Sequence, residues 1–166
     1  MKIFILSILL SFSHVLFSVE AEKPTSAIKK KSFSAETFFT KDLSFSTNFL
    51  TTPALPVLGI SKTFKTNEVF EVIIIFKGYT LSSNSAHIVY GIKISDPKGK
   101  DYYVNDKLSF NFSNLSTNQA LILDPKQFLR IKFTPPELKG KYRVYVFAVD
   151  VVSKEKSSQE VFIEHI

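Results

Sequence analysis

Cysteine and tryptophan are both absent from the 166 residues, and glycine occurs only five times. Without cysteine the chain can form no disulfide, and it cannot be lipidated on a cysteine as bacterial lipoproteins are. With so little glycine, the sequence has no Gly-rich phosphate loop and no Gly-x-Ser-x-Gly nucleophile elbow. The signatures of nucleotide-binding proteins and of α/β-hydrolases are therefore missing.

Histidine is scarce as well, with only His14, His87 and His165 in the chain. No pair has His-x-His or His-x-x-x-His spacing, so a zinc or copper site would need carboxylates from distant segments. Asp150 ends an alternating apolar run, where it is expected to accept hydrogen bonds from the following turn; a ligand-binding carboxylate is the alternative. We predict no catalytic residue, no cofactor and no metal, and so a protein that is not an enzyme.

The first 21 residues have the pattern of a secretory signal peptide. Lys2 supplies a positive charge, residues 3–17 are mostly apolar, and Val19 and Ala21 fit the signal peptidase before a cleavage after Ala21. The apolar stretch is interrupted and shorter than the roughly 20 residues of a spanning helix, although an uncleaved anchor remains the alternative. We predict an exported protein, periplasmic or extracellular, with no later membrane span. An exported domain without cysteine favours a bacterial envelope.

The formal net charge is +6, and a mature chain would keep all of it, because residues 1–21 contain one lysine and one glutamate. Apart from the run at residues 29–31, the cations are scattered along the chain. Such runs are usually solvated, and exported proteins seldom meet nucleic acid. We therefore expect no nucleic-acid partner, and at most weak attraction to anionic lipid or polysaccharide.

Residues 22–56 differ from the rest and are expected to form a leader. Residues 22–32 are polar and lysine-rich, which predicts disorder. Residues 33–58 are rich in Phe, Thr and Ser, and Pro53 and Pro56 break any long element. A stretch this aromatic is costly to expose, so we expect it to pack on the domain or to bind something.

From residue 57 to residue 166 the sequence predicts β-strands. Apolar and polar residues alternate in short runs, turn residues separate the runs, and no convincing amphipathic helix occurs. This pattern predicts an all-β, immunoglobulin-like antiparallel β-sandwich of about seven to eight strands. The candidate strands cover residues 57–61, 69–76, 87–94, 102–104, 108–112, 120–123, 128–133, 142–149 and 160–164.

Gly140 and Tyr142 resemble the corner before strand F of immunoglobulin-like sandwiches, in which a small residue precedes a tyrosine by two positions. The resemblance implies that Gly140 lets the chain cross between sheets while the Tyr142 hydroxyl bonds upstream backbone. Val144 stands where antibody domains carry a cysteine, and their core tryptophan is absent too, so this would be a disulfide-free relative.

A broader set of motifs covers roughly residues 57–166. Gly78-Tyr79, residues 95–100, and a terminal strand that opens with Gly-x-Tyr-x-Val-x-Val and ends in Asp resemble small exported bacterial proteins of uncharacterised function. The resemblance implies the fold but is nearly silent on function, because this architecture hosts many unrelated roles.

Tyr145, Phe147 and Val149 form an apolar stripe on the face opposite the core face of their strand. Sandwich strands normally carry polar residues on the outer face. Either the Phe-rich residues 33–58 cover the stripe, by folding over it or adding a strand, or it is an interaction surface. We expect a non-catalytic binding or adaptor module of the cell envelope, with an envelope protein or polysaccharide as partner. The alternatives are an assembly protein acting by strand pairing and an atypical envelope hydrolase.

Overall fold

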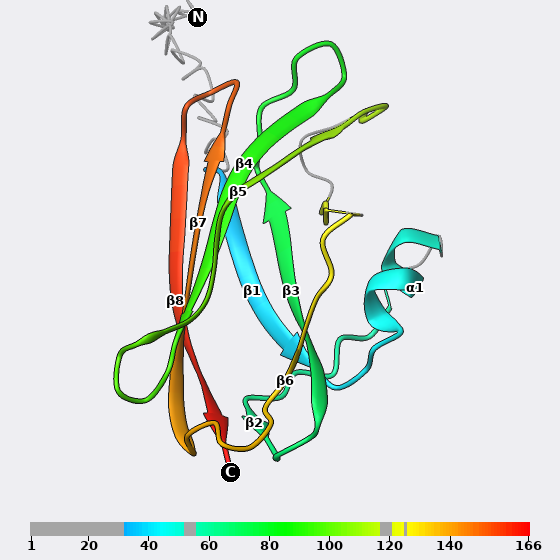
Figure 1. Ribbon diagram of the computed structural model, residues 1–166. Helices are drawn as coiled ribbons and strands as arrows, with labels where there is room; N and C mark the ends of the chain where they lie inside the picture. Colours follow the sequence, from blue (N-terminus) through cyan, green and yellow to red (C-terminus); the bar gives the residue numbers. More distant parts are fainter. Residues whose placement is uncertain (1–31, 52–55, 117–120, 125) are drawn as a thin grey trace, which may run out of the picture. The chain divides into compact units, whose positions relative to one another are not determined.

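Eight β-strands and one short α-helix make up the part of the chain that the computed structural model describes, residues 32–51, 56–116, 121–124 and 126–166 (Figure 1). They form two sheets, which we name A and B, and no described helix is long and apolar enough to cross a membrane. The expected signal peptide at residues 1–21 lies outside the described residues. Sheet A contains, in spatial order, β1 (Ser34–Thr40), β3 (Val69–Lys77) and β6 (Leu129–Lys132), and sheet B contains β2 (Thr63–Phe64), β8 (Lys156–His165), β7 (Gly140–Asp150), β4 (Ala86–Ser95) and β5 (Asp101–Phe112).

The two sheets face each other across one large apolar core, which confirms the predicted β-sandwich. All strand pairs are antiparallel except β2 with β8. Alternate residues point inward, as the period of an extended chain dictates, and a fully buried Ile or Phe contributes roughly 1.5–3 kcal/mol. The inward-facing residues of the three central strands are Phe70, Val72, Ile74 and Phe76 of β3, Ile88, Tyr90, Ile92 and Ile94 of β4, and Tyr142, Val144, Val146 and Ala148 of β7.

The described part of the expected leader is built into the sandwich. β1 pairs with β3 from Ser34 opposite Lys77 to Thr40 opposite Glu71. The domain therefore starts well before residue 57, where the sequence placed its boundary. Residues 22–31 and 52–55 of the leader lie outside the described residues.

The other edge of β1 is closed by side chains instead of a strand. The backbone N–H groups of Phe33, Ala35 and Thr37 donate to side-chain oxygens of Glu155, Ser157 and Gln159, at 2.9, 3.0 and 2.6 Å. Ser157 and Gln159 belong to β8, so this row of bonds joins sheet B to sheet A. Free edge N–H groups invite pairing with another chain, and here three of them are already satisfied.

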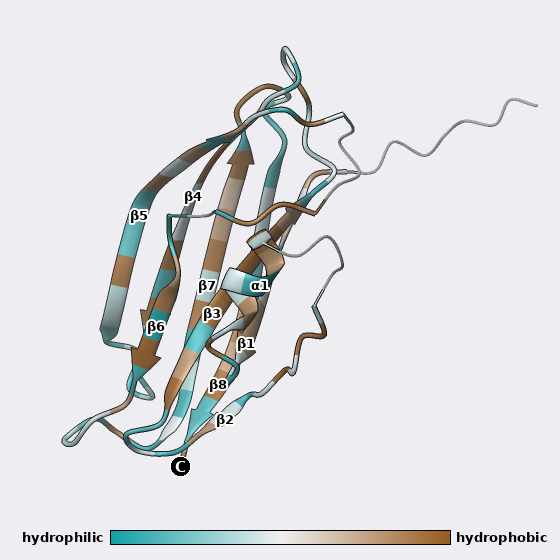
Figure 2. Cartoon of the chain, turned by 90° about the vertical axis from the view of Figure 1, so that its right-hand side faces the viewer, coloured by the Kyte–Doolittle hydropathy of each residue, from teal (hydrophilic) through white to brown (hydrophobic). Residues whose placement is uncertain are grey.

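Helix α1 (Phe45–Thr51) covers the outer face of sheet A, and Figure 2 shows it in front of β1 and β3. Ile73 and Ile75 of β3 point to that face and pack in a second cluster with Phe45 and its aromatic neighbours. This explains why β3 is apolar on both faces, the pattern that predicted a central strand. The other members of the second cluster are Leu123, Phe38, Phe49, Leu58 and Phe128.

Four of the candidate strands differ from expectation. Of residues 57–61, only Ile60 forms a bridge, with Thr40. Ile122 likewise makes a single bridge, with Phe76, where residues 120–123 were expected to form a strand. Residues 102–104 and 108–112 belong to one strand, β5, whose register against β4 shifts between Tyr90 and Ile92. The connection between β4 and β5 is the predicted tight turn, with the Gly99 N–H donating to the Asp96 carbonyl at 2.9 Å.

The corner before β7 has the geometry that its motif implies. Gly140 has φ +125°, a conformation that residues with a side chain rarely adopt. The Tyr142 ring is buried, and its hydroxyl donates to the Leu138 carbonyl at 2.9 Å. Gly140 and Tyr142 therefore act in the fold, at the opposite end of β7 from Asp150.

Candidate functional site

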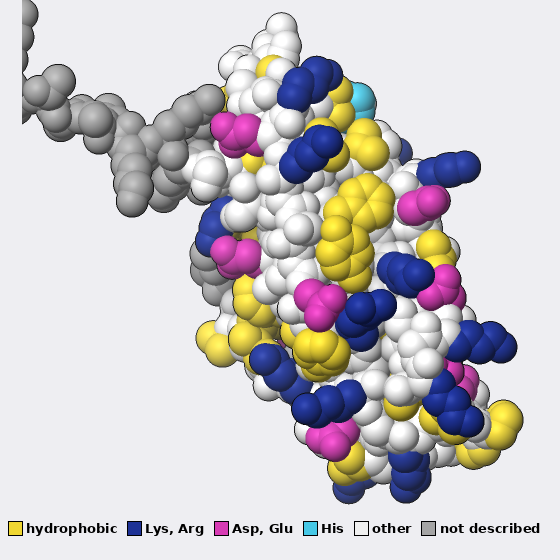
Figure 3. Space-filling view, turned by 90° about the vertical axis from the view of Figure 1, so that its left-hand side faces the viewer, with side chains coloured by type: hydrophobic (Ala, Val, Ile, Leu, Met, Phe, Trp, Pro, Cys, Tyr) yellow, Lys and Arg dark blue, Asp and Glu magenta, His cyan; other side chains and the backbone are white. Residues whose placement is uncertain are grey.

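The outer face of sheet B carries Tyr145, Phe147 and Val149, the stripe singled out in the sequence. Figure 3 views this face, on which hydrophobic side chains gather along the middle with Lys, Arg, Asp and Glu around them. Tyr145 is 39% exposed, and Phe147 and Val149 are half-buried. The structure thus brings all three predicted residues together, with the rings of Tyr145 and Phe147 6.5 Å apart.

The Phe-rich segment does not cover this stripe within the described residues. Phe38, Phe45 and Phe49 pack on the outer face of sheet A instead, against Ile73 and Ile75. The physical reason is that β3 presents Ile73 and Ile75 on the outer face of sheet A, and these two isoleucines would otherwise be exposed to water. Of the two alternatives that the sequence left open, cover of the Tyr145 stripe by residues 33–58 is not found in their described part.

Phe147 owes part of its burial to Gly91, its Cα partner on β4. A glycine in a strand leaves a gap on the sheet surface, and an aromatic ring on the neighbouring strand can fill it. A Cβ atom at position 91 would lie 2.6 Å from Cζ of Phe147 and 2.8 Å from Cα of Asp106. Phe147 is thus held flat against the sheet, which leaves Tyr145 as the more prominent ring.

Gly91→Ala is accordingly expected to lower the free energy of unfolding by about 1–3 kcal/mol, because the added methyl group collides with Phe147 and with the β5 backbone. Adding Phe147→Ala should recover part of this loss, since it removes one of the two collisions. A double-mutant cycle by urea denaturation measures the coupling. Strictly additive effects of the two substitutions would contradict the contact.

Charged groups frame the aromatic residues. Arg143 and Glu160 form an ion pair at 3.7 Å, and Lys93 pairs with Asp101 at 2.7 Å. Both pairs are about half exposed, so each stabilises the fold by only about 0–1 kcal/mol. A ring of weak ion pairs around an aromatic centre resembles the polar rim and apolar middle of a protein interface.

Tyr145 stands between two shallow hollows of this face. One, of about 200 Å³, is lined by Phe147, Val149, Lys156 and Ser158 among others. The other, of about 250 Å³, is lined by Lys93, Ser95, Arg143 and Glu160. The face is therefore a ridge with recesses on both sides, which a complementary surface could fill.

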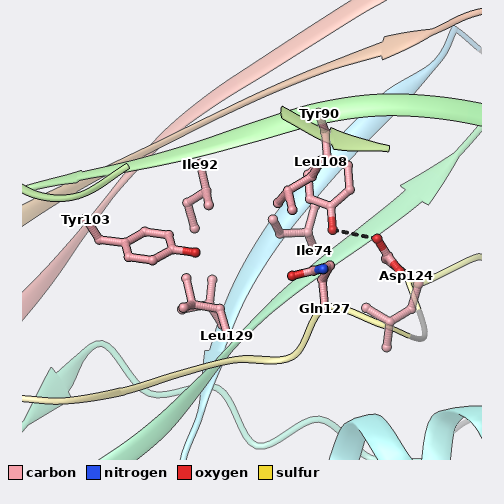
Figure 4. A pocket seen from close by; sticks show the side chains of 10 residues that line it. Ile74, Tyr90, Ile92, Tyr103, Leu108, Asp124, Gln127 and Leu129 are labelled. Carbon is pink, nitrogen blue, oxygen red and sulfur yellow. Dashed lines mark hydrogen bonds between the residues drawn. The ribbon is translucent and has the colours of Figure 1, made fainter. Parts of the chain in front are cut away.

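The most enclosed cavity lies between the sheets and is not a ligand site. It is lined by Tyr90, Tyr103, Asp124 and Leu129 among others, and it has room for about one water molecule (Figure 4). Asp124 is 3% exposed and accepts a hydrogen bond from the Tyr90 hydroxyl at 2.9 Å. Burial, together with the Asp124 carboxylate, raises the pKa of Tyr90. The pair is a satisfied polar contact of the core.

The described histidines occupy separate places. His165 ends β8, is 2% exposed, stacks on Phe133, and bonds Thr66 Oγ1 and the Leu138 carbonyl, each at 2.9 Å. His87 lies 3.2 Å from Ser109 Oγ on the outer face of sheet B. Among the described residues, no three His, Asp or Glu side chains gather as metal ligands would.

Asp150 closes one end of β7. It accepts hydrogen bonds from the Thr80 N–H at 2.7 Å, the Val152 N–H at 3.0 Å and the Ser153 hydroxyl at 2.6 Å. Burial tends to raise the pKa of Asp150, but these three donors outweigh it and hold that pKa below its ordinary value. The expected bonds to the following turn are present, and the contact with Thr80 is one that the sequence did not predict.

No protein-family model matches this chain, and no curated protein matches it. Two solved structures show a distant likeness. One is a family 123 glycoside hydrolase from Clostridium perfringens, solved in a study of glycolipid glycan hydrolysis. It has 8% sequence identity to this chain and a TM-score of 0.44, and the likeness covers 80% of this chain but only 27% of the hydrolase. The CARDB domain of a Pyrococcus furiosus protein, solved with di-metal ions, has 10% identity and a TM-score of 0.35, with 81% and 86% of the two chains covered.

The class of the protein follows from its own sheets. Sheet A with β1, β3 and β6, sheet B with β4, β7 and β8, and the Tyr142 corner define an immunoglobulin-like β-sandwich. What distinguishes this particular sandwich is that one outer face is covered by its own helix while the other presents Tyr145 and Phe147.

Proposed function

We propose that this chain is a non-catalytic binding module, exported to the bacterial cell envelope, that docks a partner on the outer face of sheet B. The observation that carries the proposal is the aromatic stripe Tyr145, Phe147 and Val149 within its charged frame. Aromatic residues ringed by polar groups are the usual anchors of binding surfaces. Export is supported by the signal-peptide pattern of residues 1–21, and an envelope protein or polysaccharide is the partner to be sought.

The arrangement of titratable groups supports a non-catalytic role. The three buried carboxylates of the described residues belong to separate networks: Glu71 beneath α1, Asp124 beside Tyr90, and Asp150 at the end of β7. Each is already hydrogen-bonded, and the cavity beside Tyr90 and Asp124 has room for only about one water molecule. Catalysis needs such groups to converge on a cleft where a substrate fits.

An assembly role through strand pairing is less well supported. The edge of β1 is occupied by side chains of sheet B. On the edge strand β5 the register shifts beside Asp106 and Lys107. Irregular pairing and charges are the usual protection of an edge strand against another chain. A docking role for the face of sheet B is therefore preferred to strand addition at its edges.

The proposal is tested with the chain from residue 22 to residue 166, immobilised and exposed to an envelope extract of the source bacterium. Bound proteins are identified by mass spectrometry and bound polysaccharide by sugar analysis. Tyr145→Glu is expected to reduce capture at least about tenfold, because it places a charge in the apolar centre. Val57→Glu is the matched control, since Val57 is 91% exposed and far along the chain from β7. Equal capture by wild type and Tyr145→Glu would refute the proposal.

A further inference from the structure

The charges beside Tyr145 are arranged in a way that suits one partner in particular. The two Cα partners of Tyr145 across the sheet are Glu160 on β8 and Lys93 on β4. Opposite charges thus stand on the two sides of the aromatic stripe, each one strand away from it. The next row has Ser158 and Gly91 beside Phe147, which keeps the centre free of bulky polar groups.

Beside Tyr145, two copies of this face can place opposite charges against each other, while Arg143 of each copy, paired with Glu160 of its own chain, comes to lie near the axis. When two identical sheets meet face to face about a twofold axis parallel to β7, β8 of one copy lies over β4 of the second. Glu160 of each copy then faces Lys93 of the other, while the stripes of Tyr145 and Phe147 meet on the axis. We propose that the partner of this face is a second copy of the chain, an inference that rests on the proposed docking role of the same face.

The usual geometry of stacked sheets permits this contact. Aligned sheets pack about 10 Å apart with strand directions about 30° apart. Lys93 and Glu160 lie about 4.8 Å from the axis, so a rotation of that size displaces them by only about 2–3 Å. Extended Lys and Glu side chains can span such a gap from both sides.

The size of the face places such a dimer at the lower end of the range of standard interfaces. Strands β8, β7, β4 and β5 span about 19 Å at ordinary strand spacing, and about ten residues of each span about 33 Å, which gives a footprint of roughly 600 Å². Standard interfaces bury about 800 Å² of accessible surface on each side. Phe162 and Val104, 48% and 51% exposed, extend the apolar surface from β7 to β8 and β5.

Charge reversal tests the pairing. Sedimentation velocity of residues 22–166 between about 1 and 200 µM is expected to show a monomer–dimer equilibrium. Lys93→Glu and Glu160→Lys should each weaken dimerisation at least about tenfold, because each places like charges opposite one another. The double variant should return to within about threefold of wild type, since the facing pair is rebuilt with inverted polarity. Lys98→Glu, in the exposed turn between β4 and β5, is the control.

The same-chain ion pairs cannot imitate this rescue. Lys93 pairs with Asp101 and Glu160 with Arg143, and in the double variant both pairs become like-charged. Recovery of the dimer therefore has to come from the contact between copies. A double variant that stays as weak as the single variants would overturn the proposed register.

A monomeric wild type at every concentration would overturn the proposed dimer. The proposed function would still stand if that monomer captures an envelope partner and Tyr145→Glu abolishes the capture. Loss of both results would refute the docking role of the face itself. A dimer that Tyr145→Glu leaves intact would likewise place the contact elsewhere and overturn the inference.

Discussion

Replacing Asp150 with alanine is expected to lower the free energy of unfolding by about 3–5 kcal/mol. The carboxylate is 0% exposed and holds the N–H groups of Thr80 and Val152 together with the Ser153 hydroxyl. Hydrogen bonds to a charged group contribute about 1.5–3 kcal/mol each, and a buried N–H left without a partner costs about 1–3 kcal/mol. Equilibrium urea denaturation measures the loss. Asp106→Asn, at an exposed position of β5, should change the value by less than about 0.5 kcal/mol.

The pH dependence gives a second measure of the same group. The pKa of Asp150 is lower in the folded chain than its ordinary value of 3.8, because the three donors outweigh the effect of burial. Its contribution to stability is therefore fully present above about pH 4 and is lost as the pH falls through the lowered pKa. Asp150→Asn cannot ionise, so the difference in stability between wild type and this variant should shrink from pH 5 to pH 2. A difference that stays constant over that range would contradict the assignment.

The sequence predicted the architecture where alternation was strong. β4 and β7 follow the period of a half-buried strand, and the turn after β4 carries its own signals in Asp96, Pro97 and Gly99. The predicted strand at residues 128–133 contains β6, whereas β2, which has only two residues, was not predicted. Whether so short a segment pairs depends on the strand beside it, and the local sequence pattern does not indicate that strand.

Which sheet the Phe-rich segment packs on could not be predicted from the local sequence alone. Hydrophobic periodicity shows that a segment needs cover, but it does not say which sheet supplies the partner. In this chain two strands had apolar outer faces, β3 with Ile73 and Ile75 and β7 with Tyr145 and Phe147. The better guide was the near-continuous apolar run of β3, because strands buried on both faces have that pattern.

The residues of the candidate site were predicted from the sequence, but the role of Gly91 beneath Phe147 was not. Tyr145, Phe147 and Val149 are visible as outward positions of an alternating strand. The role of Gly91 needed the pairing of β4 with β7, since the two residues are 56 positions apart in the chain. An isolated glycine within a strand pattern was the only available signal.

The two outer faces now have different physical explanations. The outer face of sheet A is covered by residues of its own chain, where Phe45 and Phe49 of α1 pack against Ile73 and Ile75. Sheet B keeps its aromatic stripe at the surface, where the Phe147 ring fills the gap left by Gly91 and the Tyr145 ring stays exposed. The exposure of this face is the basis of the proposed docking role.

The second large effect is expected beneath α1, where Glu71 is fully buried. Its carboxylate accepts hydrogen bonds from the Ser46 hydroxyl at 2.9 Å and from Nε of Arg130 at 3.3 Å, and Arg130 also donates to the Leu43 carbonyl at 3.0 Å. Glu71→Ala should lower the free energy of unfolding by about 3–4 kcal/mol, because it opens a cavity and leaves the buried Ser46 hydroxyl without its acceptor. Hydrogen exchange at residues 45–51 should accelerate as α1 loosens from the sheet.

A paired substitution separates this polar contact from simple packing. Glu71→Met together with Ser46→Ala removes both partners and keeps most of the volume, while Arg130, about half exposed, turns to water. Replacing a buried polar pair with apolar groups is often close to neutral, whereas removing one partner is not. The double variant is therefore expected within about 1 kcal/mol of wild type, well above Glu71→Ala, by the same denaturation measurement. If Glu71→Ala were as stable as wild type, or the double variant as unstable as Glu71→Ala, the contact would not be what fastens α1 to sheet A.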